Sequence, residues 1–167
     1  MTSPFVAILM GSDSDLPVMQ ATIAILKQFD INHEVRVRSA HRTPDAAKAY
    51  VKDAEERGCK VFICAAGLAA HLAGAVAGMT TRPVIGVPVD CGPLQGHDAL
   101  LSTVMMPGGI PVATVAIGKA GAKNAGYLAA QILGVADQSM ADKVKAERVA
   151  NAKALLAKDD AMQAKLG

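Results

Sequence analysis

Short apolar segments alternate with longer segments of mixed polarity along most of this 167-residue chain. The first apolar segment, at residues 5–10, has no polar side chain, which is typical of a strand buried on both faces of a sheet. Further strands are predicted at residues 33–38, 61–65, 84–89 and 112–117. Because such strands need a helical layer on each face, the pattern predicts an α/β fold with a five-stranded parallel sheet.

The segments between the strands carry helix signals. Thr43 and Pro44 fit the N-cap and first position of a helix that stops near Gly58. Helices are also predicted at residues 16–29, in a short segment that ends at residue 106, and at residues 120–133. With right-handed crossovers, these elements form a three-layer sandwich, for which we expect a flavodoxin-like strand order.

Residues 137–167 differ from the rest because large apolar side chains are few and scattered among Ala and Lys. The composition favours a helix, yet such a helix cannot bury a wide apolar stripe on its own domain. We therefore divide the chain into an α/β domain at residues 1–136 and a C-terminal helical extension of the same domain at residues 137–167. We expect this extension to pack on neighbouring subunits.

Two polar loops follow the first two strands, where parallel α/β sheets bind their ligands. The first is Gly11-Ser12-Asp13-Ser14-Asp15 and the second is Ser39-Ala40-His41-Arg42-Thr43-Pro44. Hydroxyls and free N–H groups at helix starts bind anions, and an arginine can form paired hydrogen bonds with a phosphate. Together the loops indicate a phosphorylated sugar or nucleotide, although the Ser and Asp residues could equally serve as helix caps and His41 could pair with Asp45.

A third loop, from Gly67 to Gly74, contains His71 among small residues. The small residues permit either a close backbone approach to a ligand or tight packing of a helix on the sheet. In the second case His71 would only hydrogen bond to a backbone carbonyl. His33 and His97 have weaker cases for function, and four dispersed histidines without paired spacing do not indicate a metal site.

Composition narrows the classes of function. The formal net charge is only +2, and the chain has three Phe, two Tyr and no Trp, so nucleic-acid binding is unsupported. The sequence has neither a signal-like beginning nor an 18-residue apolar span, so we expect a cytoplasmic protein with no membrane segment. Cys59, Cys64 and Cys91 are odd in number and lack C-x-x-C spacing, which favours buried thiols over disulfides.

The three loops described above and three segments further along the chain resemble, in their sequence and their order, the N5-carboxyaminoimidazole ribonucleotide mutase family of purine biosynthesis. The resemblance covers nearly the whole chain, and the combination of Ser-Ala-His-Arg-Thr-Pro with Ala-Ala-His-Leu is specific. The matching segments are Gly11 to Asp15, Ser39 to Pro44, Gly67 with Ala69 to Leu72, Gly86 to Pro88, Met106-Pro107 with Gly109 to Pro111, and Ala116 to Gly118 with Ala120 to Ala122.

The resemblance implies a flavodoxin-like homo-octamer that moves a carboxylate from the exocyclic nitrogen of its ribonucleotide substrate to carbon 4 of the imidazole. It implies no metal and no organic cofactor. His41 would be the catalytic proton-transfer residue, and the loop from Gly67 to His71 would close over the base and carboxylate. The residues assigned to substrate binding are Ser12, Ser14, Asp15, Ser39, Arg42, Gly67, Ala69 and His71.

The chain departs from the family pattern at Leu68, where a second glycine is commoner, and at Ala73, where proline is commoner. Because leucine reaches positive φ at a higher cost than glycine, we expect the loop to follow a different path. Two other functions stay open. One is direct carboxylation of free aminoimidazole ribonucleotide by carbon dioxide, against which the His71 loop argues. The other is a non-catalytic nucleotide-binding module in which His41 is only structural.

Overall fold

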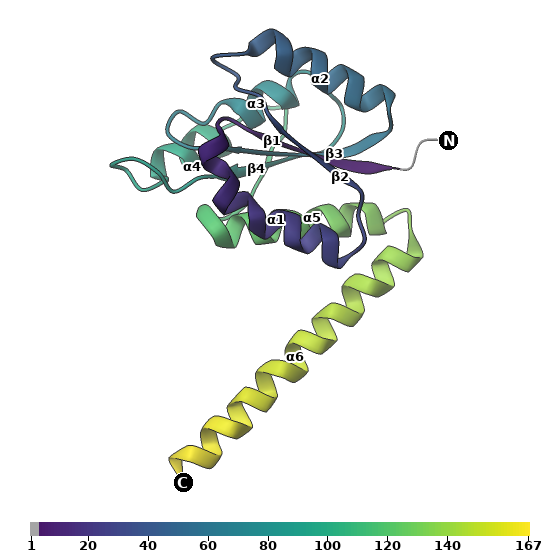
Figure 1. The fold of residues 1–167 in the computed structure, drawn as a ribbon, viewed down its shortest axis with the longest axis vertical. Coiled ribbons are helices and arrows are strands. Elements are labelled where there is room, and N and C mark those ends of the chain that lie inside the picture. The colour runs from purple at the N-terminus through teal and green to yellow at the C-terminus, as the bar shows by residue number, and fades with distance from the viewer. Residues whose placement is uncertain (1–3) are drawn as a thin grey trace.

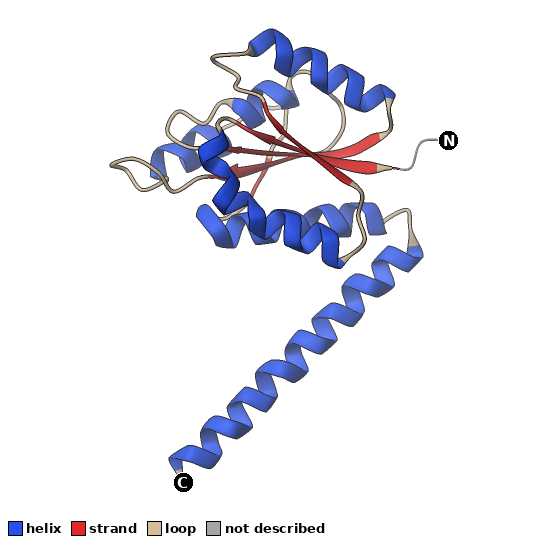
Figure 2. Cartoon of the chain, viewed as in Figure 1, coloured by secondary structure: helices blue, strands red, loops and turns tan. Residues whose placement is uncertain are grey.

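The computed structural model describes residues 4–167 and contains one five-stranded parallel sheet (Figure 2). The strand order is β2-β1-β3-β4-β5, which is the flavodoxin-like order expected from the sequence. This order places the loops after β1, β2 and β3 next to one another at one edge of the sheet. The strands are β1 (Phe5–Met10), β2 (His33–Val37), β3 (Cys59–Ala66), β4 (Val84–Pro88) and β5 (Ala113–Thr114).

Helices cover both faces of the sheet and complete the predicted three-layer sandwich (Figure 1). On one face, α1 (Leu16–Gln28) and α5 (Gly118–Gly134) pack against the core side chains of β1, β3 and β4. On the other face, α2 (Pro44–Glu56) and α3 (Leu72–Ala77) cover a second buried cluster. A short 3-10 helix, Asp13–Asp15, leads from β1 into α1.

The helix α4 (His97–Val104) approaches β4 closely because Gly86 has no side chain. A Cβ at Gly86 would lie 2.4 Å from Cγ2 of Thr103, which is well inside van der Waals contact. Thr103 itself is buried. Gly86 therefore fixes α4 beside the carboxyl end of β4, next to the loop that follows β3.

The strand predicted at residues 112–117 is wrong in length, because β5 comprises only Ala113 and Thr114. Beyond them the chain turns into α5, which begins at Gly118 with φ +69°. A Cβ at Gly121 would lie only 1.5 Å from the carbonyl oxygen of Ala116, so the first turn of α5 lies directly against the end of this segment. The early helix start leaves no room for a longer edge strand.

The C-terminal segment forms one long helix, α6 (Gln138–Leu166), as the composition predicts. Its first half is attached to the domain: Val144 is buried, Lys143 pairs with Asp30 at 3.0 Å, and the Tyr127 hydroxyl donates to Glu147 at 3.1 Å. Its second half extends away from the domain (Figure 1). The exposed large apolar residues of this half are Val149, Leu155, Leu156, Met162 and Leu166. Within residues 4–167, no helix is both long and apolar enough to cross a membrane.

Candidate active site

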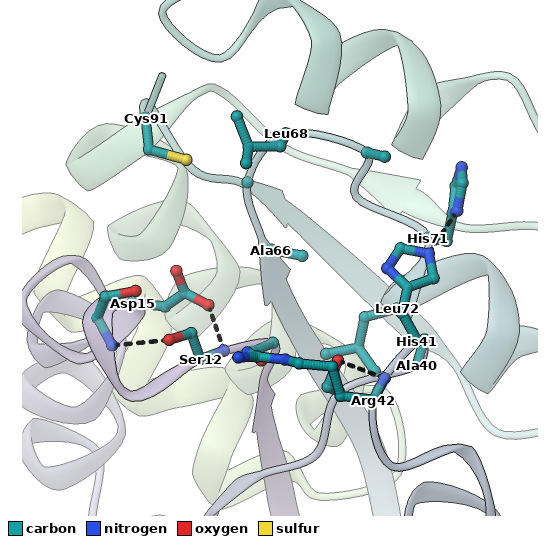
Figure 3. A pocket seen from close by; sticks show the side chains of 15 residues that line it. Ser12, Asp15, Ala40, His41, Arg42, Ala66, Leu68, His71, Leu72 and Cys91 are labelled. Carbon is teal, nitrogen blue, oxygen red and sulfur yellow. Dashed lines mark hydrogen bonds between the residues drawn. The ribbon is translucent and has the colours of Figure 1, made fainter.

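A cavity of about 280 Å³ lies at the carboxyl ends of β1, β2 and β3 (Figure 3). Its lining comes from the loops that follow these three strands, together with Cys91 from the loop after β4. The structure thus brings together every site residue predicted from the sequence. These residues are Ser12, Ser14, Asp15, Ser39, His41, Arg42, Gly67, Ala69 and His71.

The loop after β1 is stabilised by hydrogen bonds within itself. The Ser12 amide donates to Oδ2 of Asp15 at 3.0 Å, and the Ser14 amide donates to Oγ of Ser12 at 3.3 Å. These groups therefore do cap a helix, as the alternative interpretation expected, while they also line the cavity. The Asp15 residue is only 6% exposed. Burial raises the pKa of this carboxyl above its ordinary value, and the Ser12 and Gly11 amides and Arg42 oppose that rise.

The loop after β2 is organised around Ser39. Its hydroxyl accepts from the Arg42 amide at 3.1 Å, and its own amide donates to the Thr43 hydroxyl at 3.0 Å. Thr43 occupies the predicted N-cap position, but its hydroxyl turns back to Ser39 and makes no capping bond to α2. We call residues 11–15 and 39–43 together the capped wall of the cavity.

Arg42 joins the two parts of the capped wall. Its guanidinium donates to the carbonyl oxygen of Gly11 at 2.8 Å, and Figure 3 shows the side chain lying along the cavity toward Ser12. The remaining guanidinium donors are available to a ligand. A cation beside two serine hydroxyls and helix-start amides is an environment that suits a phosphate.

His41 and His71 contact each other directly. Nε2 of His41 lies 2.8 Å from Nδ1 of His71, and the two rings stand almost perpendicular, at 86°. Only one of the two facing nitrogens donates in this hydrogen bond, so the pair shares one proton along it. His41 therefore bonds to His71, and not to Asp45 as one interpretation of the sequence allowed. The ring of His71 in turn bonds to His41, where a backbone carbonyl was the alternative.

The loop at residues 67–71, hereafter the 67–71 loop, rests on residues far away in the sequence. A Cβ at Gly67 would lie 2.0 Å from Sγ of Cys91, so this close approach requires glycine. The Ala70 amide donates to Oγ of Ser102, on α4, at 3.0 Å. Sequence reasoning did not find Ser102 as a contact of the site, because its neighbours in the chain give no sign of what it touches in the fold.

Leu68 takes a backbone conformation that is costly for leucine. Its φ is +55°, so leucine takes the left-handed conformation that glycine would adopt more easily. The side chain lies against Gly92, where a Cβ would be 2.5 Å from Cδ2 of Leu68. Contact with Gly92 keeps the leucine in place despite the backbone cost. Ala73, the second departure from the family pattern, is buried in α3. Within residues 4–167, no group of three His, Cys, Asp or Glu side chains is arranged to hold a metal ion.

Comparison with known proteins identifies relatives over most of the chain. The family model described as "AIR carboxylase" matches residues 5–154. A Thermotoga maritima protein named N5-carboxyaminoimidazole ribonucleotide mutase is 58% identical over 142 residues, covering 85% of this chain and 82% of that protein. A Mycobacterium tuberculosis H37Rv protein with the same name is 53% identical over 160 residues, covering 96% and 91%.

Solved structures show the same fold. The crystal structure of Treponema denticola PurE superposes with a TM-score of 0.85 at 34% identity, covering 95% of this chain and 98% of that one. The match includes the α/β domain and most of α6, since it leaves out only a twentieth of the chain. On the strength of the family match and of relatives that are more than half identical, the chain belongs to the AIR carboxylase family.

Proposed function

We propose that this enzyme converts N5-carboxyaminoimidazole ribonucleotide into 4-carboxyaminoimidazole ribonucleotide in purine biosynthesis. Relatives that bear the name of this mutase share more than half of its residues over most of its length. The observation that carries the proposal is one cavity lined by a histidine pair, an arginine and three serines. The reaction requires a group that carries protons to and from the substrate, and the substrate's phosphate requires a group that binds it.

The chemistry requires a cavity that closes over the substrate. A carboxylate on nitrogen leaves readily as carbon dioxide, so the substrate can split into aminoimidazole ribonucleotide and carbon dioxide within the site. Holding both fragments together replaces a second-order encounter and allows recapture at carbon 4. The departing nitrogen gains one proton and carbon 4 loses one, so the net reaction is an isomerisation. His41 can deliver the first proton and remove the second.

The capped wall binds the ribose phosphate in this proposal. Arg42 and the hydroxyls of Ser12, Ser14 and Ser39 contact the phosphate, and Asp15 accepts hydrogen bonds from the ribose. The 67–71 loop covers the base and the carboxylate, with Gly67, Ala69 and His71 against the substrate. No cofactor takes part.

Direct carboxylation of aminoimidazole ribonucleotide is the second candidate, because the description of the matching family names that reaction. Turnover separates the two. Purified protein is supplied with the N-carboxylated substrate or with aminoimidazole ribonucleotide and bicarbonate, and formation of the carbon-4 product is followed. We expect rapid turnover of the first at micromolar concentration and slow turnover of the second. Faster turnover of aminoimidazole ribonucleotide with bicarbonate would identify a carboxylase. If neither substrate gave product, the protein would be a non-catalytic binding module.

We also propose a cytoplasmic homo-octamer in which residues 1–136 form the catalytic domain and residues 137–167 pack on neighbouring subunits. The exposed apolar residues in the second half of α6 support this assembly, since five large apolar side chains on one projecting helix are left without a covering partner in the single chain. A location in the cytoplasm suits an enzyme of nucleotide biosynthesis.

Two truncations test the assembly. Ending the chain after Ala136 removes all of α6. Ending it after Arg148 keeps the attached part of α6 and removes residues 149–167, which include the exposed apolar residues. We expect both to lower the mass measured by light scattering and to reduce turnover, with the domain still folded in the shorter deletion. A chain that ends after Arg148 with unchanged mass and activity would contradict a role for α6 in either.

A further inference from the structure

The helix α4 lines no part of the cavity, yet the side chain of Ser102 on this helix accepts a hydrogen bond from the backbone of the 67–71 loop. Ser102 and Thr103 lie on consecutive positions of α4, and both hydroxyls lie near the backbone of Ala70. Oγ of Ser102 is 3.0 Å from the Ala70 amide, and Oγ1 of Thr103 is 3.5 Å from the Ala70 carbonyl oxygen. The loop is therefore attached to α4 immediately before His71.

The Ser102 hydroxyl is oriented for this contact. Its strongest donor bond runs to the Asp98 carbonyl oxygen, one helical turn earlier, at 2.7 Å. With its proton used there, the oxygen keeps lone pairs for the Ala70 amide. Thr103 shows the same helical pattern, since its hydroxyl lies 2.7 Å from the Ala99 carbonyl oxygen. The two side chains are thus fixed by their own helix before they meet the loop.

The Ala70 amide has no other hydrogen-bond acceptor at hand if the Ser102 hydroxyl is removed. Ala70 is only 2% exposed, so water reaches its backbone poorly, and within residues 4–167 the hydrogen bond to Ser102 is the one that its amide makes. A buried amide without a partner is unfavourable, so loss of the hydroxyl forces the loop to shift until the amide finds another acceptor.

Such a shift moves His71 directly. The His71 amide bonds to the Ala69 carbonyl oxygen at 3.0 Å, forming a tight turn, and its own carbonyl begins α3 by accepting from the Ala75 amide at 2.9 Å. The backbone at residues 69–71 therefore decides where the His71 ring lies. That ring is 2.8 Å from Nε2 of His41 (Figure 3), so a small displacement breaks the contact between the rings.

We propose that Ser102 is a positioning residue for the proton-transferring histidine pair: it holds the Ala70 amide, and through it the His71 ring against His41. This inference rests on the proposed mutase function for its effect on turnover. Its effect on ring geometry is independent of that function. Gly86 takes part indirectly, since its missing side chain lets α4 approach close enough for the hydroxyl to reach the loop.

The test compares Ser102→Ala with Ser102→Thr, which keeps the hydroxyl, and with Thr114→Val. Thr114 contacts the carbonyl oxygen of Thr103 on the same helix at 3.4 Å but touches no part of the 67–71 loop. We expect Ser102→Ala to lower kcat about tenfold while KM stays within about twofold, because misplacement of a reacting group acts mainly on the transition state. Ser102→Thr should recover most of kcat, and Thr114→Val should match the wild type.

A double-variant comparison shows whether Ser102 acts through His71. In a His71→Ala protein, Ser102→Ala should change kcat by less than about twofold, because the ring that it positions is gone. An unchanged kcat in Ser102→Ala would overturn the proposal, and so would a tenfold loss that persists in the His71→Ala protein.

Nuclear magnetic resonance of the histidine ring nitrogens gives a readout that needs no turnover. We expect the His41 and His71 signals to shift in Ser102→Ala and to stay in place in Thr114→Val. Unshifted ring signals in Ser102→Ala would overturn the proposal even if activity fell. If the wild type showed no turnover, the mutase function would fail, while the ring signals would still decide the role of Ser102.

Discussion

The two walls of the cavity are fixed by contacts of very different range. In the capped wall, the bonds from Ser12 to Asp15 and from Arg42 to Ser39 span three residues each. In the 67–71 loop, the bond from Ala70 reaches Ser102, 32 residues away, and the loop also rests on Cys91 and Gly92. Each loop of the capped wall therefore depends on its own sequence, and one long-range bond from Arg42 to Gly11 joins the two loops. The 67–71 loop depends on the correct placement of β4 and α4.

Because the two walls differ in this way, we expect substitutions in them to have different effects. A change of His41 removes a chemical group and leaves the capped wall in place, because its ring bonds to His71 and to no part of that wall. A change beneath the 67–71 loop alters geometry, because the groups that touch the substrate remain but move. Variants in the first wall should therefore affect one step each, while variants in the second should affect stability and turnover together.

The largest effect is expected from His41→Asn in the capped wall. Asparagine keeps the polarity but cannot carry a proton, so turnover should fall at least about a hundredfold. Substrate affinity should stay within about tenfold, a change of about 1.4 kcal/mol. Steady-state activity assays measure the turnover, and calorimetry measures the substrate affinity.

His97→Asn is the matched control for this variant. His97 is exposed, and its ring contacts the carbonyl oxygen of Leu94 at 3.0 Å, outside the cavity. Its turnover should equal that of the wild type. Wild-type turnover in His41→Asn would remove His41 from the mechanism and make the capped wall a purely binding surface.

Arg42→Ala should weaken substrate binding about tenfold to a hundredfold, because hydrogen bonds to a charged group contribute about 1.5–3 kcal/mol. Lysine at this position should recover only part of the affinity, since it lacks the planar fork of donors. Arg36→Ala serves as a control, because Arg36 lies on β2 away from the cavity. Calorimetry that found equal affinity in Arg42→Ala and Arg36→Ala would place the phosphate elsewhere.

Gly67→Ala tests the long-range wall. The added methyl group would meet Sγ of Cys91 at 2.0 Å, and relief of such a clash typically costs about 1–3 kcal/mol of stability. We expect a lower melting temperature together with reduced turnover. Adding Cys91→Ala to the same chain should restore most of both. A double variant as unstable as Gly67→Ala alone would show that Cys91 is not the group that limits the space.

The smallest effect concerns the pH dependence of stability at Asp15. Burial raises the pKa of this carboxyl in the folded chain, so the folded state binds the proton more tightly than the unfolded state. The wild type should therefore gain stability relative to Asp15→Asn as the pH falls through the raised value, and the gain should level off below the ordinary value. Melting curves of both proteins from neutral to acidic pH measure the difference. A difference that is constant with pH would contradict the raised pKa.

The same contrast explains what the sequence could predict. The strands and the capped wall follow from local patterns, because apolar runs mark the strands and Ser, Asp and Pro mark the helix starts. The length of β5 was wrong, since the apolar run continues while the contact between Gly121 and Ala116 ends the strand. That contact exists only once the sheet has formed.

The contact between the two histidines could not be predicted from the sequence either. His41 and His71 were each predicted as site residues, but their hydrogen bond depends on β2 and β3 lying on either side of β1 in the sheet. Leu68 shows the opposite case. Leucine disfavours a positive φ, yet Leu68 has a φ of +55° and its side chain packs against Gly92. Neither the histidine contact nor the backbone conformation of Leu68 can be read from the few residues on either side.

The three thiols of the chain differ in access, and this gives the protein a built-in reporter of its cavity. Cys59 and Cys64 are buried in the sheet, and burial raises the pKa of both, to about 11 for Cys59, so alkylating reagents reach them only through unfolding. Cys91 is partly exposed and lines the cavity beside Gly67. A small alkylating reagent would therefore react at Cys91 in the folded protein, and a ligand in the cavity would slow that reaction.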